Sequence, residues 1–244
     1  MARTSQDILK LVEEQRVEFI SLQFTDIVGV IKNVTIPAAQ LADCLDHGVW
    51  FDGSSIEGFA RIAESDMFLV PDLESFAVVP WDREAGFATA RLICDVYTPE
   101  GKPFAGDPRN CLKGALEEAA QMGFVYNVGP ELEFFLFKPG DDGQRVPMPH
   151  DAAGYFDLTT DEAADVRKEM VEALEALGIV VEASHHEVAI GQHEIDFKYD
   201  DAMRTADNAV TFRTTLKAVA PSASLSQGMM PNVSRSGSRY MSLS

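Results

Sequence analysis

Hydrophobic and polar residues alternate in short blocks through the first hundred residues, as in a small mixed α/β unit. Ser5 precedes Ile8, Leu9 and Val12, which share one helical face, so we expect an amphipathic helix ending near Arg16. The same reasoning predicts one further helix and five strands in this block: a helix over 37–45, and strands over 17–24, 29–36, 67–70, 76–79 and 89–97.

A second block follows the turn-forming residues at 98–103, which predict a domain boundary. Asp107 and Pro108 favour a helix start, because the acid caps the first turn and proline fits its first position. We expect this helix to stop at Gly123 and a mostly extended segment over 124–137, interrupted at Gly129-Pro130, to follow it. After that segment we expect a helix from a capping box of Thr159 and Glu162 to Gly178, a strand over 179–183, and a helix from Asp200 or Asp201 to about Val219.

Residues 184–199 hold three of the five histidines, interleaved with acids and with residues of high strand propensity. Gly191-Gln192 between two alternating runs predicts a hairpin with a two-residue turn. In that register Glu187 lies opposite Asp196, and Glu194 lies diagonally across the same face, roughly 7–8 Å from Glu187. Two interpretations fit this face: acids in water, which the pattern alone favours, or carboxylates joined by a hard divalent cation.

Glu131 and Glu133 are two residues apart in the extended segment, so their side chains project from the same face of a strand. Phe135 and Phe137 continue that face, which argues against simple exposure to water. Two partly buried like charges have either raised pKa values or a cation between them. The alternative is an edge strand whose acids reach water past the phenylalanine rings.

Composition narrows the class of protein. At 244 residues with 46% hydrophobic and 24% charged residues, the chain has enough material for one or two globular domains. A net charge of −19 argues against nucleic acid or an anionic membrane as a partner. Three scattered cysteines, no signal-peptide pattern and no apolar run of membrane-spanning length predict a cytoplasmic protein with reduced thiols.

Other motifs add little by themselves. The loop Asp52-Gly53-Ser54-Ser55 offers a carboxylate and hydroxyls, but such loops are mostly ordinary turns. His185 and His186 alternate, so at most one of them shares a face with Glu187, and a lone histidine is more often structural than a ligand. The sequence has no glycine loop for phosphate and no Gly-x-Ser-x-Gly elbow, so a nucleotide would be held mainly through metal.

Taken together, these residues resemble glutamine synthetase of the bacterial dodecameric type I, over about residues 5–220. Several separated motifs carry the resemblance, which makes it far more specific than any single pattern. The matching segments are Gln23-Phe24-Thr25-Asp26, Phe51-Asp52-Gly53-Ser54-Ser55-Ile56-Glu57-Gly58-Phe59, Glu64-Ser65-Asp66-Met67, Gly106-Asp107-Pro108-Arg109, Gly129-Pro130-Glu131-Leu132-Glu133-Phe134-Phe135, Gly154-Tyr155-Phe156-Asp157 and the hairpin at 184–199.

The resemblance implies an α+β fold. Residues 1–103 would form an N-terminal β-grasp domain. Residues 104–220 would form the first part of the catalytic domain, an incomplete antiparallel sheet or barrel with helices. Residues 221–244 are serine-rich and contain no acid, and we expect them to be disordered and foreign to the family.

The resemblance also implies roles for individual residues. Glu133, Glu187 and Glu194 would bind one Mg²⁺ or Mn²⁺ ion, and Glu131 would contribute to a second. By the same comparison Asp196 becomes a structural or supporting residue, and His185 and His186 are set aside as ligands. Asp52 and Ser55 would belong to a loop that reaches the ammonium site of a neighbouring subunit. Tyr155 would lie near that ammonium site, and Glu182 would contact the nucleotide.

The implied reaction uses ATP, L-glutamate and ammonia in a homo-oligomeric enzyme, a dodecamer in this family. The glutamate γ-carboxylate would attack the γ-phosphoryl group of ATP, and ammonia would then displace phosphate. The family's catalytic domain runs well past residue 244, and its later histidine, arginines and carboxylate are absent from this sequence. A truncated reading frame, inactive alone, is the simplest interpretation.

Two other interpretations remain open. The chain could be a related glutamate–amine ligase that uses a larger amine, although Asp52 and Tyr155 favour ammonia. It could also be a non-catalytic protein that binds metal or assembles with full-length subunits through its β-grasp domain.

Overall fold

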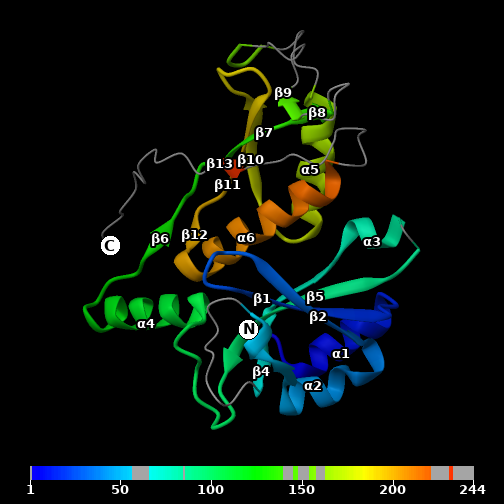
Figure 1. The fold of residues 1–244 in the computed structure, drawn as a ribbon, viewed down its shortest axis with the longest axis vertical. Coiled ribbons are helices and arrows are strands. Elements are labelled where there is room, and N and C mark those ends of the chain that lie inside the picture. Colours follow the sequence, from blue (N-terminus) through cyan, green and yellow to red (C-terminus); the bar gives the residue numbers. More distant parts are fainter. Residues whose placement is uncertain are drawn as a thin grey trace. The chain divides into compact units, whose positions relative to one another are not determined.

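The computed structural model describes residues 2–56, 66–84, 86–139, 145–147, 154–157, 163–220 and 231–232. The chain forms two compact units, Met1–Phe124 and Val125–Ser244, whose elements are labelled in Figure 1. Among the residues described, no helix is both long and apolar enough to cross a membrane.

The first unit is built on a five-stranded sheet with the order β2-β1-β5-β4-β3. The central strand β5 runs parallel to its neighbour β1, and every other pair is antiparallel. The strands are β1 Phe19–Thr25, β2 Ile31–Pro37, β3 Val49–Asp52, β4 Asp66–Val78 and β5 Thr89–Tyr97. The bounds of β5 are those the sequence predicts, and every position from Thr89 to Val96 is buried, the polar Thr89, Arg91 and Asp95 included.

The region expected to hold two short strands around a turn at Pro71-Asp72 is instead the single strand β4. Its pairing with β5 shifts between Asp72 and Ala77, so the extra residues form a bulge. The Ser75 hydroxyl donates to the Asp72 carbonyl at 2.6 Å and accepts from the Ile93 amide at 2.7 Å. The predicted turn is wrong because these bonds satisfy the bulge locally and let β4 continue along β5.

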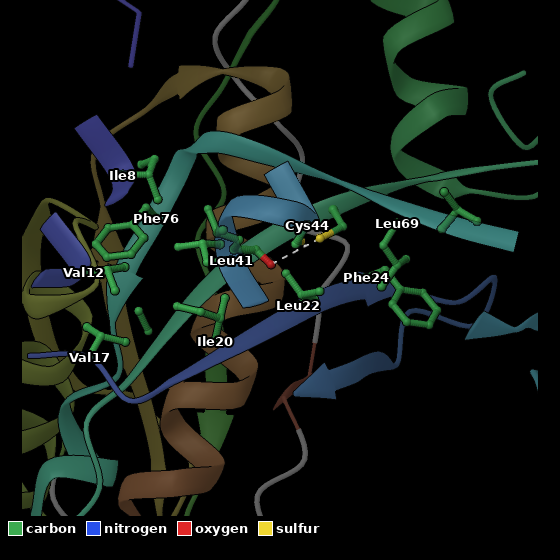
Figure 2. Close-up of a cluster of buried hydrophobic side chains, with 14 of the residues drawn as sticks. Ile8, Val12, Val17, Ile20, Leu22, Phe24, Leu41, Cys44, Leu69 and Phe76 are labelled. Carbon is green, nitrogen blue, oxygen red and sulfur yellow. Dashed lines mark hydrogen bonds between the residues drawn. The ribbon is translucent and has the colours of Figure 1, made fainter. Parts of the chain in front are cut away.

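Helices α1 Ser5–Glu14 and α2 Leu41–His47 supply the apolar cover for this sheet, and the short 3-10 turn η1 Ala38–Gln40 leads into α2. Thr4, rather than the expected Ser5, caps α1 in a reciprocal box with Asp7. Figure 2 shows side chains of both helices packed with those of β1 in one buried cluster. The cluster includes Ile8, Val12, Val17, Ile20, Leu22, Phe24, Leu41, Cys44, Leu69 and Phe76.

Two more helices complete the unit, α3 Pro80–Glu84 and α4 Pro108–Gln121. Asp107 caps α4 by accepting from the Arg109 amide at 2.9 Å, as predicted. The buried Arg109 guanidinium bonds Asp95 at 2.7 Å and Asp72 at 2.8 Å, and Lys113 also pairs with Asp95. These bonds fasten α4 to the first unit, so the compact units divide after Phe124, and the domain boundary at 103–104 stays a prediction.

The second unit is organised around an antiparallel sheet with the order β10-β11-β7-β13. Its strands are β7 Glu133–Phe135, β10 Val181–His186, β11 Gln192–Phe197 and β13 Pro231–Asn232. Two separate two-stranded sheets pair β6 Asn127–Val128 with β12 Asp200–Asp201, and β8 Phe137–Pro139 with β9 Arg145–Pro147. The extended segment expected over 124–137 forms three short strands, and the interruption expected at Gly129-Pro130 is confirmed, because β6 ends at Val128 and β7 begins at Glu133.

Helices α5 Ala164–Ala176 and α6 Ala202–Val219 pack with this sheet in a second core that contains Phe134, Met170, Ile195 and Phe212. Asp201 caps α6 through bonds from the amides of Met203 and Arg204, which confirms one of the two predicted caps. For α5, the residue before the helix is Ala163, which makes no side-chain cap. The capping box expected from Thr159 and Glu162 lies outside the described residues.

Most of the segment expected to be disordered, 221–244, also lies outside the described residues. Pro231 and Asn232 are the exception, because they pair with Phe134 and Glu133 of β7 as strand β13. At these two positions, therefore, the chain is in a strand.

We predict that Arg109→Met destabilises the first unit by about 3–5 kcal/mol, because it leaves the buried Asp95 carboxylate and the half-buried Asp72 carboxylate without the Arg109 guanidinium. The measurement is urea unfolding followed by circular dichroism. Lys10→Met is the control, since its ion pair with Glu14 is exposed and should contribute less than about 1 kcal/mol. Equal effects of the two substitutions would contradict the assignment.

Candidate metal centre

The two faces of strand β11 differ completely in chemistry. His193, Ile195 and Phe197 are buried in the core, while Glu194 and Asp196 point from the opposite face. His185 of β10 pairs directly with Glu194, and Glu133 of β7 pairs with Glu194 from the other side. Because directly opposed residues share a face, three strands bring acids and one imidazole together.

The hairpin register that creates this face differs from the predicted one. His186 pairs with His193, so residues 187–191 form the connection and Glu187 is not opposite Asp196. The Glu187 amide donates to the Gln192 carbonyl at 2.8 Å, and the Gln192 amide donates to the Ala189 carbonyl at 3.0 Å. The two-residue turn is wrong because these bonds close a longer loop, with Gly191 at a positive φ of 67°.

His185, Glu187 and Glu194 form the tightest group on this face. One ligand atom from each lies within 4.8 Å of the other two. The Nδ1 atom of His185 is 3.4 Å from Glu187 Oε1, and its Nε2 atom is 3.6 Å from Glu194 Oε2. Sequence reasoning set His185 aside as a ligand, yet the structure places its ring between the two carboxylates.

The carboxyl groups on this face repel each other when they are ionised. Burial, with the neighbouring Glu187 and Asp196 carboxyl groups, raises the pKa of Glu194 from 4.5 to about 8. Burial also raises the pKa of Asp196. Without a cation, therefore, the cluster retains a proton at neutral pH, and a divalent ion would replace that proton.

The donor set fits such an ion. Two ligand atoms about 2.1 Å from one ion and at right angles to each other lie about 3 Å apart. The 3.4 and 3.6 Å distances start from opposite ring nitrogens of His185, and a single ion can use only one of them. The relevant spacing is therefore the 4.8 Å within which one ligand atom from each of the three residues lies, and the side chains would move closer together to bind the ion. Carboxylate oxygens suit Mg²⁺, and Mn²⁺ accepts an imidazole as well.

Glu133 is on the same face but holds a different bond. Its Oε2 atom accepts from the Gln192 side-chain amide at 2.9 Å, while Gln192 Oε1 accepts from the Ala189 amide at 3.2 Å. Gln192 therefore links the loop of the hairpin to β7. Sequence reasoning missed this residue, although its alternation with Glu194 and Asp196 was a signal that could have found it.

A pocket of about 690 Å³ is lined by Asp196, whose Oδ2 atom is 3.9 Å from His185 Nε2, so the pocket adjoins the group of His185, Glu187 and Glu194. Two further predicted site residues, Glu131 and Glu182, line this pocket. Its wall also carries Phe197 and Tyr199, so it combines acids with aromatic surface. Its volume is in the range of small-molecule sites, which are concave and largely apolar.

Tyr155 also belongs to this neighbourhood. Its ring centroid lies 5.1 Å from that of His185, and the adjacent Phe156, at a positive φ of 66°, lies 5.1 Å from the same ring. Burial and then the charges of Glu187 and Glu194 raise the pKa of Tyr155. The tyrosine therefore stays neutral and presents a hydroxyl close to the acids.

Asp52 and Ser55 lie in the first unit, away from these residues in sequence. Asp52 ends β3 and caps the short 3-10 turn η2 Gly53–Ser55. It accepts from the Ser54 amide at 2.9 Å and from the Ser54 hydroxyl at 2.6 Å, and these bonds lower its pKa. The exposed Asp52 carboxylate is thus held charged and fixed in direction.

Fold and site together define an α+β protein with an acid cluster suited to a hard cation, set on an antiparallel sheet. The family model described as the catalytic domain of glutamine synthetase matches residues 105–239. The model described as the glutamine synthetase β-grasp domain matches residues 16–99. The chain belongs to the glutamine synthetase family, whose members are ligases.

Individual relatives agree with this result. A glutamine synthetase of Halobacterium salinarum is 54% identical over 225 residues, covering 92% of this chain and 50% of that protein. A glutamine synthetase of Clostridium saccharobutylicum is 53% identical over 229 residues, covering 93% of this chain and 52% of that protein. The chain thus spans about half the length of the curated relatives it matches.

Solved structures give the same coverage. A GmaS/ADP complex matches with a TM-score of 0.81 and 32% identity, over 92% of this chain and 51% of that one. Plasmodium falciparum glutamine synthetase matches with a TM-score of 0.79 over 94% of this chain and 50% of that one. At 22% identity, the second match supports the fold alone.

These comparisons confirm the family and the predicted fold class, a β-grasp domain followed by part of a catalytic domain. They also extend the match. The catalytic-domain model continues to residue 239, beyond the limit near 220 that we expected from the sequence. Most of the segment expected to be foreign to the family is therefore included in it.

We predict that Glu187→Gln and Glu194→Gln each weaken Mn²⁺ binding about tenfold or more, since each removes a charged ligand atom while keeping side-chain volume. Isothermal titration calorimetry measures the dissociation constant. Glu175→Gln is the matched control, an exposed glutamate on α5. Unchanged Mn²⁺ affinity in both cluster variants would argue that the acids do not form the site.

Proposed function

We propose that this chain carries the metal- and nucleotide-binding part of a glutamate–ammonia ligase site. The arrangement of His185, Glu187 and Glu194 beside an acid-lined pocket supports this most directly. Membership of the glutamine synthetase family supports the choice of reaction, ATP-dependent joining of ammonia to L-glutamate. The cation would be Mg²⁺ or Mn²⁺.

We assign the residues as follows. Glu187 and Glu194 bind one ion, with Glu133 released from Gln192 to join them. Glu131, at the pocket wall, serves a second ion near the ATP phosphates, and Glu182 contacts the nucleotide. Tyr155 and, from another subunit of an oligomer, Asp52 and Ser55 form the ammonium site.

The chemistry proceeds in two steps. The γ-carboxylate oxygen of glutamate attacks the γ-phosphorus of ATP, and the bond to the β–γ bridging oxygen breaks to release ADP. The nitrogen of ammonia then attacks the resulting acyl carbon, and inorganic phosphate leaves. A bound divalent cation supplies charge neutralisation at the phosphoryl oxygens.

The charges of the chain's own residues suit these steps. The Asp52 carboxylate, held ionised by Ser54, can attract ammonium and accept a proton from it. The neutral Tyr155 hydroxyl, next to His185, can orient the same nitrogen. The Glu194 carboxyl group, whose pKa burial raises to about 8, would release its proton when a metal ion binds, so metal affinity is expected to rise with pH.

We place the first domain at 1–103 and begin the second at 104; the catalytic-domain match carries the second past the expected limit at 220 to residue 239, which leaves 240–244 as a tail. The limits of the two family models, 99 and 105, support the first boundary. A second candidate function, assembly with full-length subunits through the β-grasp domain, is favoured by the complete sheet and core of the first unit. Size-exclusion chromatography with and without a full-length relative tests this second function.

We predict that Mn²⁺ increases the affinity for a fluorescent ATP analogue about tenfold or more, because the ion neutralises repulsion between the phosphates and the acids. Fluorescence titration of the wild type and of Glu194→Gln, with and without Mn²⁺, measures the increase. The variant should lose the increase and Glu175→Gln should keep it. Binding independent of Mn²⁺ would count against the proposed site.

We further predict no measurable glutamine formation by a purified chain of these 244 residues with ATP, Mg²⁺, glutamate and ammonium. Residues that the family uses for glutamate and phosphate lie in the half of the relatives that this chain does not match. Chromatographic detection of glutamine is the measurement, with a full-length relative as the positive control. ATP-dependent glutamine synthesis by this chain would refute the prediction.

A further inference from the structure

Behind the acid face, the core side of the same hairpin contains a polar stack of three residues. Arg167 of α5, His193 of β11 and His186 of β10 are 5%, 0% and 1% exposed. The Arg167 Nη1 atom is 3.0 Å from His193 Nδ1. The two imidazole rings meet edge to face, with centroids 4.8 Å apart and planes at 81°.

Hydrogen-bond chemistry determines the proton positions in this stack. An arginine guanidinium can only donate, so His193 Nδ1 must accept and its proton must be on Nε2. A backbone carbonyl can only accept, and His186 Nδ1 contacts the Glu187 carbonyl oxygen, so His186 must carry its proton on Nδ1. The two rings therefore use Nδ1 in opposite ways: that of His193 accepts a hydrogen bond and that of His186 donates one.

The last of these bonds reaches a metal-ligand candidate. Glu187 is the first residue after β10, and its carbonyl and amide are both bonded, to His186 and to the Gln192 carbonyl. Fixing both ends of this residue limits the directions its side chain can take. The Glu187 carboxylate then lies 3.4 Å from His185, inside the cluster.

We propose that His186 is a positioning residue for Glu187, and that Arg167 and His193 hold the His186 ring in the orientation this requires. The inference rests on the proposed metal function. Three apolar side chains would fill the same core space without desolvating a charge and two imidazoles. A directional bond to the Glu187 carbonyl is what the polar stack supplies and apolar packing does not.

Substitution at His186 tests this role. Asn places an amide nitrogen near the position of Nδ1 and keeps the donor, whereas Leu keeps volume and removes the donor. We expect His186→Leu to weaken Mn²⁺ binding about tenfold to a hundredfold, as supporting bonds at metal sites do. His186→Asn should bind Mn²⁺ within about threefold of wild type. Calorimetry measures both, and Glu175→Gln is the control.

The proton positions give a second test that needs no metal and no variant. Long-range ¹H–¹⁵N NMR of the wild-type chain should show His186 protonated on Nδ1 and His193 on Nε2. If His186→Leu does not fold, this result and the Asn variant decide between the alternatives. A His186 ring without a proton on Nδ1 would overturn the inference, because it could not donate to the Glu187 carbonyl.

The outcomes also separate this inference from the function on which it rests. No Mn²⁺ binding by wild type would remove the proposed metal function. If wild type binds Mn²⁺ and Glu187→Gln loses binding, the metal site stands. Equal Mn²⁺ affinity of His186→Leu and His186→Asn would then overturn the role of His186.

Discussion

The second unit depends on a single constraint, the alternation of side chains along the hairpin β10–β11. One face must be apolar enough to pack against α5 and α6, and Ile195, Phe197 and Phe134 meet that need. The other face is then free to carry Glu194, Asp196 and His185, because the backbone that holds them is fixed from behind. A slip of one residue would exchange the two faces and destroy both the core and the acid cluster.

The two units handle concentrated charge in different ways. In the first, Arg109 and Lys113 neutralise Asp72 and Asp95, and the result is a rigid attachment of α4. In the second, the imidazole of His185 lies 3.4–3.9 Å from the carboxylates of Glu187, Glu194 and Asp196, and burial raises the pKa of Glu194 to about 8, so that this carboxyl group retains a proton. The paired charges around Arg109 therefore hold α4 in place, whereas the acids around His185 have no matching cationic side chain among the described contacts and can bind a cation.

Some elements could be predicted because their signals are local. The cap at Asp107, the strand over 89–97 and the helix from Asp201 depend on neighbouring residues, and the structure has them where expected. The turn at Pro71-Asp72 and the two-residue turn at Gly191-Gln192 were wrong for a common reason. In each case hydrogen bonds outside the expected turn replaced the local preference: the Ile93 amide of β5 donates to the Ser75 hydroxyl, and Gln192 bonds Glu187 and Ala189 within the longer loop.

The sequence by itself determined the family, the α+β class and the residue types at the site, since separated motifs and local capping signals survive without coordinates. The tertiary structure alone decided which acids meet. It placed His185 between Glu187 and Glu194, bonded Glu133 to Gln192, and put Asp196 at the pocket wall. The physical reason is that register and loop length set distances across strands, and these depend on packing between segments far apart in the chain.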